Sequence, residues 1–457
     1  MKLRIILPFF CLALGTAPLL ALQVDPAAGD DKNDGVSAPL KTIARAVRLA
    51  QPGDTVLLKP GTYWESVDLS NKHGQPGKPV TVDGQGAVIN GSEPVKAVDW
   101  ESLGGGLFRK VKLMPRMDKA ILGRWFFLWN GSMNHMGRTS KGPSKPLKKV
   151  EELQVNEWTY AEAEDAFYLK LPEGQGLDAA NIRYPARSSG VILSGKGAHL
   201  VVRNITCTHV YNDGFNIHGD QVDTVFEKIA AIDCGDDGFS AHEAAECRID
   251  GFVSIGNSTG LCDTVSSVTH YKNVFISRCL GHDIFFIGDS PHSMENVLVE
   301  SSAAYALTVS RHGDREQKGL SRVHLKNVVM RRRPDLAGNI RVTGESFLEA
   351  ENCTFLGLDA QVTPRGEMKL TKSVIAPSGD DRKPEVLIYA EARWSGAGNR
   401  YDLKSLRWGP ALYNADIFAQ FQDTHTTEAG SKWLPGPLNA ETGIGADEKA
   451  LETLRRP

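Results

Sequence analysis

The chain has 457 residues, of which 41% are hydrophobic and 23% are charged, and its formal net charge is −3 at pH 7. This composition excludes an intrinsically disordered chain, and the length suits one elongated domain or two to three compact ones. Acidic and basic residues are interspersed without a basic block, so no nucleic-acid partner is expected.

The N-terminus, MKLRIILPFFCLALGTAPLLA, is typical of a cleaved secretory signal peptide covering residues 1–21. Lys2 and Arg4 precede an apolar run, residues 5–14, that is too short to span a membrane, and small residues follow it up to Ala21. We therefore expect a secreted or periplasmic protein without membrane insertion, and a monomer.

Six cysteines follow the predicted signal peptide. An even number in an oxidising compartment permits disulfides, whereas their apolar surroundings suit buried free thiols equally well. No CxxC or HxxxH spacing of a zinc site occurs, so neither a metal nor a cofactor is predicted from spacing. The six are Cys207, Cys234, Cys247, Cys262, Cys279 and Cys353.

Residues 22–97 predict an N-terminal cap and the first coils of a stack of strands. A helical pattern covers 41–50, and Pro52-Gly53-Asp54 separates it from a strand at 55–59. A helix in this place shields the open end of a stack of strands. The stretch from Pro39 to Tyr63 resembles the opening of exported carbohydrate-active β-helix (pectin-lyase-like) proteins. That group includes hydrolases, lyases and epimerases, so the resemblance implies the fold and leaves the reaction open.

Residues 98–185 have no regular interval and are rich in aromatic residues, which indicates a small inserted β-subdomain. The layout resembles that of β-helix glycosidases, β-xylosidases among them, which carry an insertion near this point. Trp125 and Trp129 are candidates for a sugar-stacking wall; the alternative is that the aromatic residues form the insert's own core.

Short strand-like runs recur at a nearly constant interval over residues 186–378. A second series lies between them, at 215–217, 239–241, 285–287 and 306–309. This pattern predicts an all-β fold, a right-handed parallel β-helix with coils of about 22–24 residues. An antiparallel sandwich would not hold so regular an interval. The first runs end at Ile205, Ile229, Val253, Ile276 and Val299, which are 24, 24, 23 and 23 residues apart.

Residues 379–457 lose the repeat but keep aromatic residues. We expect this segment to pack along the solenoid or to cap its far end.

Two stretches of the repeat, YNDGFNIHGD at 211–220 and GDDGFSAHEA at 235–244, match position by position. If Phe215 and Phe239 point inward as an apolar stack, strand alternation directs His218 and His242 outward. Acidic residues flank these strands, and stacked coils bring them within one coil of each other. The acidic residues are Asp213, Asp236, Asp237 and Glu243.

Such a patch suits the cleavage of a glycosidic bond. One carboxylic acid protonates the leaving oxygen, and a carboxylate attacks or activates water, at about 5 Å or 6.5–9.5 Å separation. Close carboxylates repel, which raises the pKa of one of them. The predicted catalytic residues are therefore Asp213, Asp236, Asp237, Glu243, His218 and His242. Asp and Asn also stabilise turns, so an Asp-Gly pair on two coils has a purely structural interpretation as well.

The same residues resemble the motifs of the polygalacturonase family. Gly235-Asp236-Asp237 matches its Gly-Asp-Asp motif, and Asn212-Asp213 matches part of its Asn-Thr-Asp motif. The resemblance implies that Asp213, Asp236 and Asp237 act together on a polysaccharide or oligosaccharide. It also makes His282, Arg311 and His312 candidates for substrate binding.

Two other classes of function remain open. In a polysaccharide lyase or uronate epimerase the acidic residues would bind Ca²⁺, and a base near Arg311 would remove a proton. Tyr211 to His218 resembles the Tyr-Gly-Phe-Asp-Pro-His-Asp signature of mannuronan epimerases, with Asn216 in place of the first Asp. The third class is a non-catalytic, glycan-binding β-helix.

Overall fold

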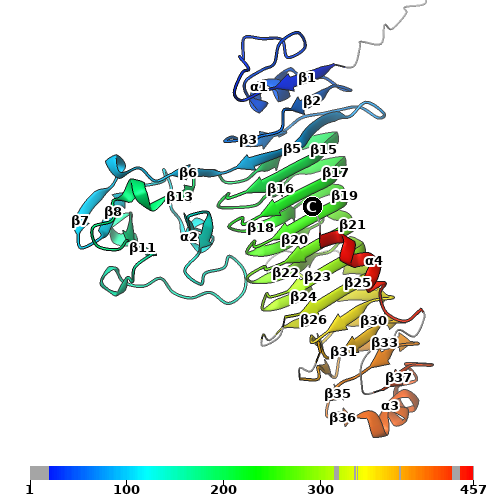
Figure 1. Cartoon of the computed structure of the whole chain (residues 1–457). Helices are drawn as coiled ribbons and strands as arrows, with labels where there is room; N and C mark the ends of the chain where they lie inside the picture. The colour runs from blue at the N-terminus through cyan, green and yellow to red at the C-terminus, as the bar shows by residue number, and fades with distance from the viewer. Residues whose placement is uncertain are drawn as a thin grey trace, which may run out of the picture.

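The computed structural model describes residues 20–312, 319–333, 336, 338–379, 382–434 and 443–455. Two long sheets run side by side along the axis of the solenoid, and their strands stack from coil to coil. A lobe made of two small sheets projects from the side near the N-terminal end (Figure 1). Nearly all neighbouring strands of the long sheets are parallel, so the fold is the predicted parallel β-helix with an inserted β-subdomain. The signal-peptide prediction falls mainly on residues 1–19, outside the described residues.

The first sheet contains seventeen strands among the described residues, and its longer members turn a corner of the solenoid. The strands are β1 (Ala21–Val24), β2 (Thr55–Leu58), β3 (Thr62–Tyr63), β5 (Val80–Asn90), β15 (Lys196–Thr208), β17 (Asp220–Ile232), β19 (Ala244–Ile255), β21 (Val268–Ser277), β23 (Pro291–Ser301), β25 (Ser321–Arg332), β27 (Ser346–Glu351), β28 (Thr354–Leu356), β30 (Glu367–Thr371), β31 (Val374–Ala376), β33 (Arg393–Ala397), β34 (Arg400–Tyr401) and β37 (Lys432–Trp433).

The second sheet contains twelve described strands and carries the candidate site. They are β4 (Val67–Asp68), β14 (Val191–Leu193), β16 (Phe215–Ile217), β18 (Asp237–Ala241), β20 (Thr259–Val265), β22 (His282–Gly288), β24 (Tyr305–Ser310), β26 (Asn339–Thr343), β29 (Asp359–Val362), β32 (Glu385–Ile388), β35 (Ser405–Trp408) and β36 (Ala411–Tyr413). Phe215 and Phe239 stack inside the solenoid with ring centroids 6.1 Å apart, as their spacing predicts.

The register of the first sheet corrects the predicted interval. Thr206, Ala230, Val253, Phe275 and Leu298 pair in succession, which gives steps of 24, 23, 22 and 23 residues. Val253 was expected to share a column with Ile229, but Phe252 is in register with Ile229 and Val253 lies one position further on. The interval varies because the turns between strands can gain or lose a residue while the strands of successive coils still pair.

The prediction also omitted strand β20. Asp263 occupies an inward position of this strand, where it interrupts the apolar alternation. Its carboxylate accepts hydrogen bonds from the Tyr271 hydroxyl at 2.9 Å and from the Thr269 hydroxyl at 2.6 Å. A buried acid with these partners is tolerated inside the solenoid, and it conceals the strand from a hydrophobic pattern.

A column of asparagines forms the corner within the long strands of the first sheet. Asn273, Asn296 and Asn327 have φ between 54° and 57°, a left-handed conformation that Asn adopts more readily than most residues. The Asn327 carboxamide donates to that of Asn296 at 2.8 Å, and Asn296 donates to Asn273 at 3.3 Å. The ladder therefore links successive coils at a point where the main chain turns.

The N-terminal helix α1 (Ile43–Leu49) caps the solenoid, as expected. Thr42 accepts a hydrogen bond from the Arg45 N–H at the start of the helix, and Ile43, Ala46 and Val47 join the main core. The apolar face of the helix thereby covers the first strands.

The prediction that the repeat is lost after residue 379 is wrong. Strands β32, β33, β34, β35 and β37 continue both sheets in register, and helix α3 (Phe418–His425) packs Phe418 and Phe421 against the far end. The step from Val374 to Arg400 is 26 residues and the step from Arg400 to Lys432 is 32, so the longer coils obscure the interval.

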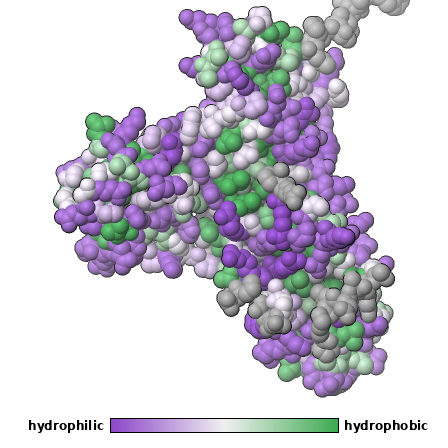
Figure 2. Space-filling model, viewed as in Figure 1, coloured by the Kyte–Doolittle hydropathy of each residue, from purple (hydrophilic) through white to green (hydrophobic). Residues whose placement is uncertain are grey.

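After this end cap the chain returns along the outside of the solenoid. Helix α4 (Glu448–Leu451) and the 3₁₀ helix η6 (Glu452–Arg455), which together we call the strap, lie across β21 to β25 (Figure 1). Leu451 is 2% exposed and packs with Phe275, Leu298 and Val329. Figure 2 shows an apolar area beside the strap, where Ala230 and Val253 line a groove that ends at Leu454.

All six cysteines after the N-terminal segment are buried free thiols, so the disulfide alternative does not hold. Their small side chains fill the core or pack on the sheets, and burial raises the pKa of the Cys207 thiol.

The insert consists of two antiparallel four-stranded sheets around an aromatic core. Trp125, Phe127, Trp158 and Phe167 are at most 1% exposed. The proposed role of Trp125 in a sugar-stacking wall is therefore wrong, because its ring is enclosed. The strands are β6 (Ser92–Pro94), β9 (Phe127–Trp129), β10 (Ser132–Asn134) and β13 (Ile182–Pro185) in one sheet, and β7 (Glu101–Gly104), β8 (Leu107–Val111), β11 (Glu157–Ala161) and β12 (Ala166–Lys170) in the other.

Candidate functional site

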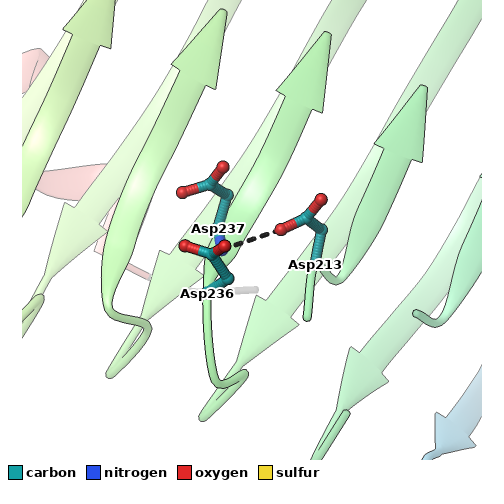
Figure 3. A group of neighbouring side chains, drawn as sticks. All are labelled: Asp213, Asp236 and Asp237. Carbon is teal, nitrogen blue, oxygen red and sulfur yellow. Dashed lines mark hydrogen bonds between the residues drawn. The ribbon is translucent and has the colours of Figure 1, made fainter. Parts of the chain in front are cut away.

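Three carboxylates from two successive coils of the solenoid lie close together (Figure 3). Asp213 lies in the turn before β16, and Asp236 and Asp237 lie at the start of β18. One oxygen from each lies within 4.8 Å of the others. We call these residues the acidic triad; their exposed fractions are 4%, 6% and 2%.

The Asp-Gly pairs position the triad. The Asp237 N–H donates to the Asp213 carboxylate at 3.1 Å, which ties the two coils together (Figure 3). A Cβ on Gly214 would lie 2.7 Å from the Ala231 Cβ, so a side chain does not fit there without displacement. The glycine is thus required by packing, whereas the neighbouring aspartates project outward toward the insert.

The insert supplies cations that sequence reasoning missed. The Lys141 Nζ donates to Asp236 at 2.6 Å and to Asp237 at 2.7 Å, and an Arg124 guanidinium nitrogen lies 3.0 Å from Asp236. The Ser140 hydroxyl also donates to Asp236. These residues belong to an irregular, Gly- and Pro-rich part of the chain, and no periodic signal linked them to the repeat.

Glycines allow the insert to lie directly against the solenoid. A Cβ on Gly281 would lie 1.7 Å from the Lys141 carbonyl oxygen, and one on Gly235 would lie 2.3 Å from the Arg124 carbonyl oxygen. The Ser140 N–H donates to the Ser258 hydroxyl at 2.9 Å. The insert therefore closes over the triad through specific backbone contacts.

The environment separates the pKa values of the three carboxyl groups. Burial, with the charge of Asp236, raises the pKa of Asp213 to about 7. Burial and Asp236 likewise raise the pKa of Asp237. Burial also disfavours the charged form of Asp236, but the charges of Lys141 and Arg124 outweigh it and lower the pKa of Asp236 to about 2. The triad thus combines Asp236, whose charged form is favoured, with two carboxyl groups whose affinity for a proton is raised.

The structure does not bring His218, His242 and Glu243 to the triad, so their predicted place there is wrong. The histidine rings stack 4.2 Å apart, as expected, but His242 is five residues beyond Asp237, or about 16 Å along an extended strand. Glu243 has φ 59° and accepts a hydrogen bond from the Gly219 N–H at 2.5 Å. Its carboxylate stabilises a turn at the other end of the sheet.

His282 lies nearer the triad, in the column that continues from Asp237 through Thr259. The imidazole stacks on Phe285 and on Tyr305, each at 4.6 Å, and is 6% exposed. Burial, with the charges of Lys141 and Arg341, lowers its pKa to about 4. His282 is therefore a neutral group beneath the edge of the insert.

Arg311 and His312 follow β24 at the end of the sheet away from the triad. The Arg311 guanidinium binds Glu345 at 2.7 Å. The prediction that they join the acidic residues in one site is wrong, because the strand length separates the two ends. Trp129 is half-buried at the edge of the insert core and lines a pocket there.

Comparison with known proteins agrees with this fold. Residues 27–70 match the family described as "Protein of unknown function (DUF1565)". An uncharacterised protein of Bacillus subtilis (strain 168), YwoF, is 36% identical over 85 residues, which is 18% of this chain and 18% of YwoF. The chain thus spans less than a fifth of that relative's length.

Among solved structures, the complex of XylC with xylose superimposes with a TM-score of 0.57 at 11% identity, covering 91% of this chain and 86% of the other. A structure described as a glycoside hydrolase gives a TM-score of 0.51 at 11% identity, covering 94% and 99%. At this level of identity the likeness shows a shared fold over nearly the whole chain.

Proposed function

We propose that the protein is a carbohydrate-active enzyme, a glycoside hydrolase that acts on a polysaccharide or oligosaccharide. The observation that carries the proposal is the acidic triad, in which carboxyl groups within 4.8 Å of one another have pKa values pushed in opposite directions. The structural neighbours described as XylC with xylose and as a glycoside hydrolase support it.

The pKa values assign the roles. Asp213, whose pKa is raised, donates its proton to the glycosidic oxygen as the C–O bond breaks. Asp236, which is anionic, attacks the anomeric carbon or takes a proton from the attacking water. In the first case water then cleaves the glycosyl ester, and Asp213 receives the proton of that water. The separation of the carboxyl groups is closer to the spacing of about 5 Å typical of retaining enzymes.

Substrate access requires a change at the insert, because Lys141 and Ser140 cover the triad. We propose that the segment around Lys141 withdraws when a sugar enters, and that sugar hydroxyl groups replace its hydrogen bonds to Asp236. A loop that excludes water in this way strengthens electrostatic interactions in the closed site.

The experiment follows reducing ends and the ultraviolet absorbance of unsaturated uronates together, with the protein lacking residues 1–21, on neutral and uronate-containing polysaccharides. New reducing ends without absorbance are expected. Asp213→Asn and Asp236→Asn should each lower kcat by about 10²–10⁴-fold, while the matched control Asp220→Asn, at an exposed position, retains activity. Full activity of both triad variants would contradict the proposal.

A calcium-assisted lyase is the second candidate, because three clustered carboxylates are the hard oxygen donors that Ca²⁺ prefers. The Lys141 ammonium lies between Asp236 and Asp237, so Ca²⁺ and Lys141 exclude each other at this position. Burial lowers the pKa of Lys141, but the charges of Asp236 and Asp237 outweigh burial and hold the pKa well above its ordinary value, which disfavours Lys141 as a base. Loss of activity in EDTA, its return with Ca²⁺ and a rise in absorbance would favour the lyase.

Export of the mature chain and action as a monomer belong to the same proposal. Saturable glycan binding without either product signal would instead favour a non-catalytic, glycan-binding β-helix, and inversion at C5 of a uronate would favour an epimerase.

A further inference from the structure

The pocket of the insert that Trp129 lines lies away from the acidic triad. It has a volume of about 300 Å³ and lies at the tip of the β9–β10 hairpin. None of its nine lining residues carries a charge, and five of them carry a carboxamide or a hydroxyl group. The five are Asn130, Ser132, Asn134, Asn156 and Gln175, and Trp129 supplies an aromatic ring.

Part of this lining is held rigidly by the protein. The Asn134 carboxamide donates to the Asn156 carbonyl at 2.9 Å and accepts from the Met136 N–H at 3.1 Å. The Trp129 ring packs edge-on against Phe127 at 5.9 Å, which fixes its plane. The pocket is therefore formed before any ligand arrives.

Other lining groups have no partner within the described part of the chain. The side chains of Ser132, Asn156 and Gln175 make no hydrogen bond there, and the indole N–H of Trp129 is buried without an acceptor. Carboxamides donate and accept together, as sugar hydroxyl groups do, and an aromatic ring offers a flat apolar surface to the C–H face of a sugar. The absence of charge from the lining favours a neutral sugar over a uronate.

We infer that this pocket is a binding site for a neutral oligosaccharide, separate from the triad. The same hairpin connects the two places: Arg124 precedes β9 and Lys141 follows β10, and both bind Asp236. Trp129 is five residues from Arg124, or about 16 Å along an extended chain. A glycan held at the tip thus lies on the element whose two ends close the triad. The binding site goes beyond the proposed hydrolysis and does not require it.

The test measures binding of xylotetraose, cellotetraose and mannotetraose by calorimetry, with tetragalacturonate as the acidic counterpart. The Asp213→Asn variant is used so that the ligand is not consumed. At least one neutral tetraose should bind saturably, with tetragalacturonate weaker. Trp129→Ala should weaken binding about tenfold or more, and Gln175→Ala should weaken it less.

Two further variants guard the interpretation. Trp129→Phe retains a ring and should keep most of the affinity, which separates loss of stacking from loss of folding. Trp64→Ala removes a Trp that is 45% exposed on the solenoid and should bind like the parent. Equal affinity of the Trp129→Ala and Trp64→Ala variants, or no binding of any neutral tetraose at millimolar concentration, would overturn the inference. Because binding is measured in an Asp213→Asn background, failure of the proposed hydrolysis does not affect this result.

Discussion

The solenoid and the insert become rigid by different means. In the solenoid, each coil repeats the position of the one before, so Phe215 and Phe239, His218 and His242, and Asn296 and Asn327 stack as like on like. In the insert, Trp100, Trp158 and Phe167, which come from no common repeat, meet Phe127 edge-on. The candidate site combines the two, because the repeat supplies its acids and the irregular insert supplies its cations.

Truncation of a core side chain in the solenoid or in the insert should have the largest effect on stability. Phe239→Ala and Trp158→Ala should each cost about 3–5 kcal/mol, because both side chains are fully buried. If the regions are separate cooperative units, hydrogen exchange should show Trp158→Ala opening the insert alone. The control Val222→Ala, 44% exposed, should change stability by less than about 0.5 kcal/mol. One common transition, shifted equally by both variants, would mean that the two regions unfold together.

Removal of the cation that joins the regions should have the next largest effect. Lys141→Met removes the ion pairs that Lys141 makes with Asp236 and Asp237, while Asp236 keeps its ion pair with Arg124. We expect a loss of about 3 kcal/mol in the docking of the insert. Urea denaturation and limited proteolysis between residues 138 and 145 measure it. Lys145→Met, an exposed position in the same segment, is the matched control. Unchanged proteolysis would show that the insert docks without this ion pair.

The triad should also give the stability an opposite dependence on pH on either side of pH 4. Asp236 has a folded-state pKa of about 2, below its ordinary 3.8, so its contribution is present above pH 4 and is lost as the pH falls toward 2. Asp213 has a folded-state pKa of about 7, so its contribution is present below pH 4 and is lost as the pH rises to 7. In Asp213→Asn the decline between pH 4 and 7 should be smaller, as measured by urea unfolding at each pH. An unchanged decline would exclude Asp213 as its source.

The column of asparagines at the corner of the first sheet should show the smallest effect on stability. Asn296→Ala removes the hydrogen bonds to Asn273 and Asn327 and places Ala at φ 57°, so a loss of about 1–2 kcal/mol is expected in thermal unfolding. Lys228→Gly, at φ 49° in the same column, should instead stabilise by up to about 1 kcal/mol. A loss at both positions would mean that the left-handed corner does not carry the strain that we assign to it.

The sequence predicted the fold because successive coils of the solenoid carry residues of the same type at the same positions. The apolar pair Phe215 and Phe239 indicated which side faces inward, and the fixed interval placed the turn residues Asp213 and Asp237 on neighbouring coils. It failed where a coil changed length, as after Val374, and where a polar residue faced inward, as at Asp263. In both places the strands stay in register in the structure. The interval in sequence changes after Val374, and the apolar pattern is interrupted at Asp263.

The sequence predicted the acidic residues of the site but not its cations. The aspartates lie on the repeat, so one-dimensional spacing sufficed to place them together. Arg124 and Lys141 bind Asp236 although they are about 100 residues away in sequence. They come close because Gly235 and Gly281 allow the backbone of the insert to contact the solenoid, and no sequence pattern indicates this contact. Glu243, His218 and His242 were grouped with the acids because the spacing in sequence does not distinguish the two ends of a strand.

The strap has a consequence for the order in which the protein folds. In a simple stack each coil depends only on its neighbours, so it can form progressively from one end. Here Arg331 binds Glu448 at 2.7 Å across 117 residues, and Leu451 covers residues from three coils. Those contacts form only after residues 448–455 have been synthesised, which makes strap docking a late step of high contact order. Once docked, the strap connects middle coils to the C-terminal end and opposes fraying that would otherwise spread one coil at a time.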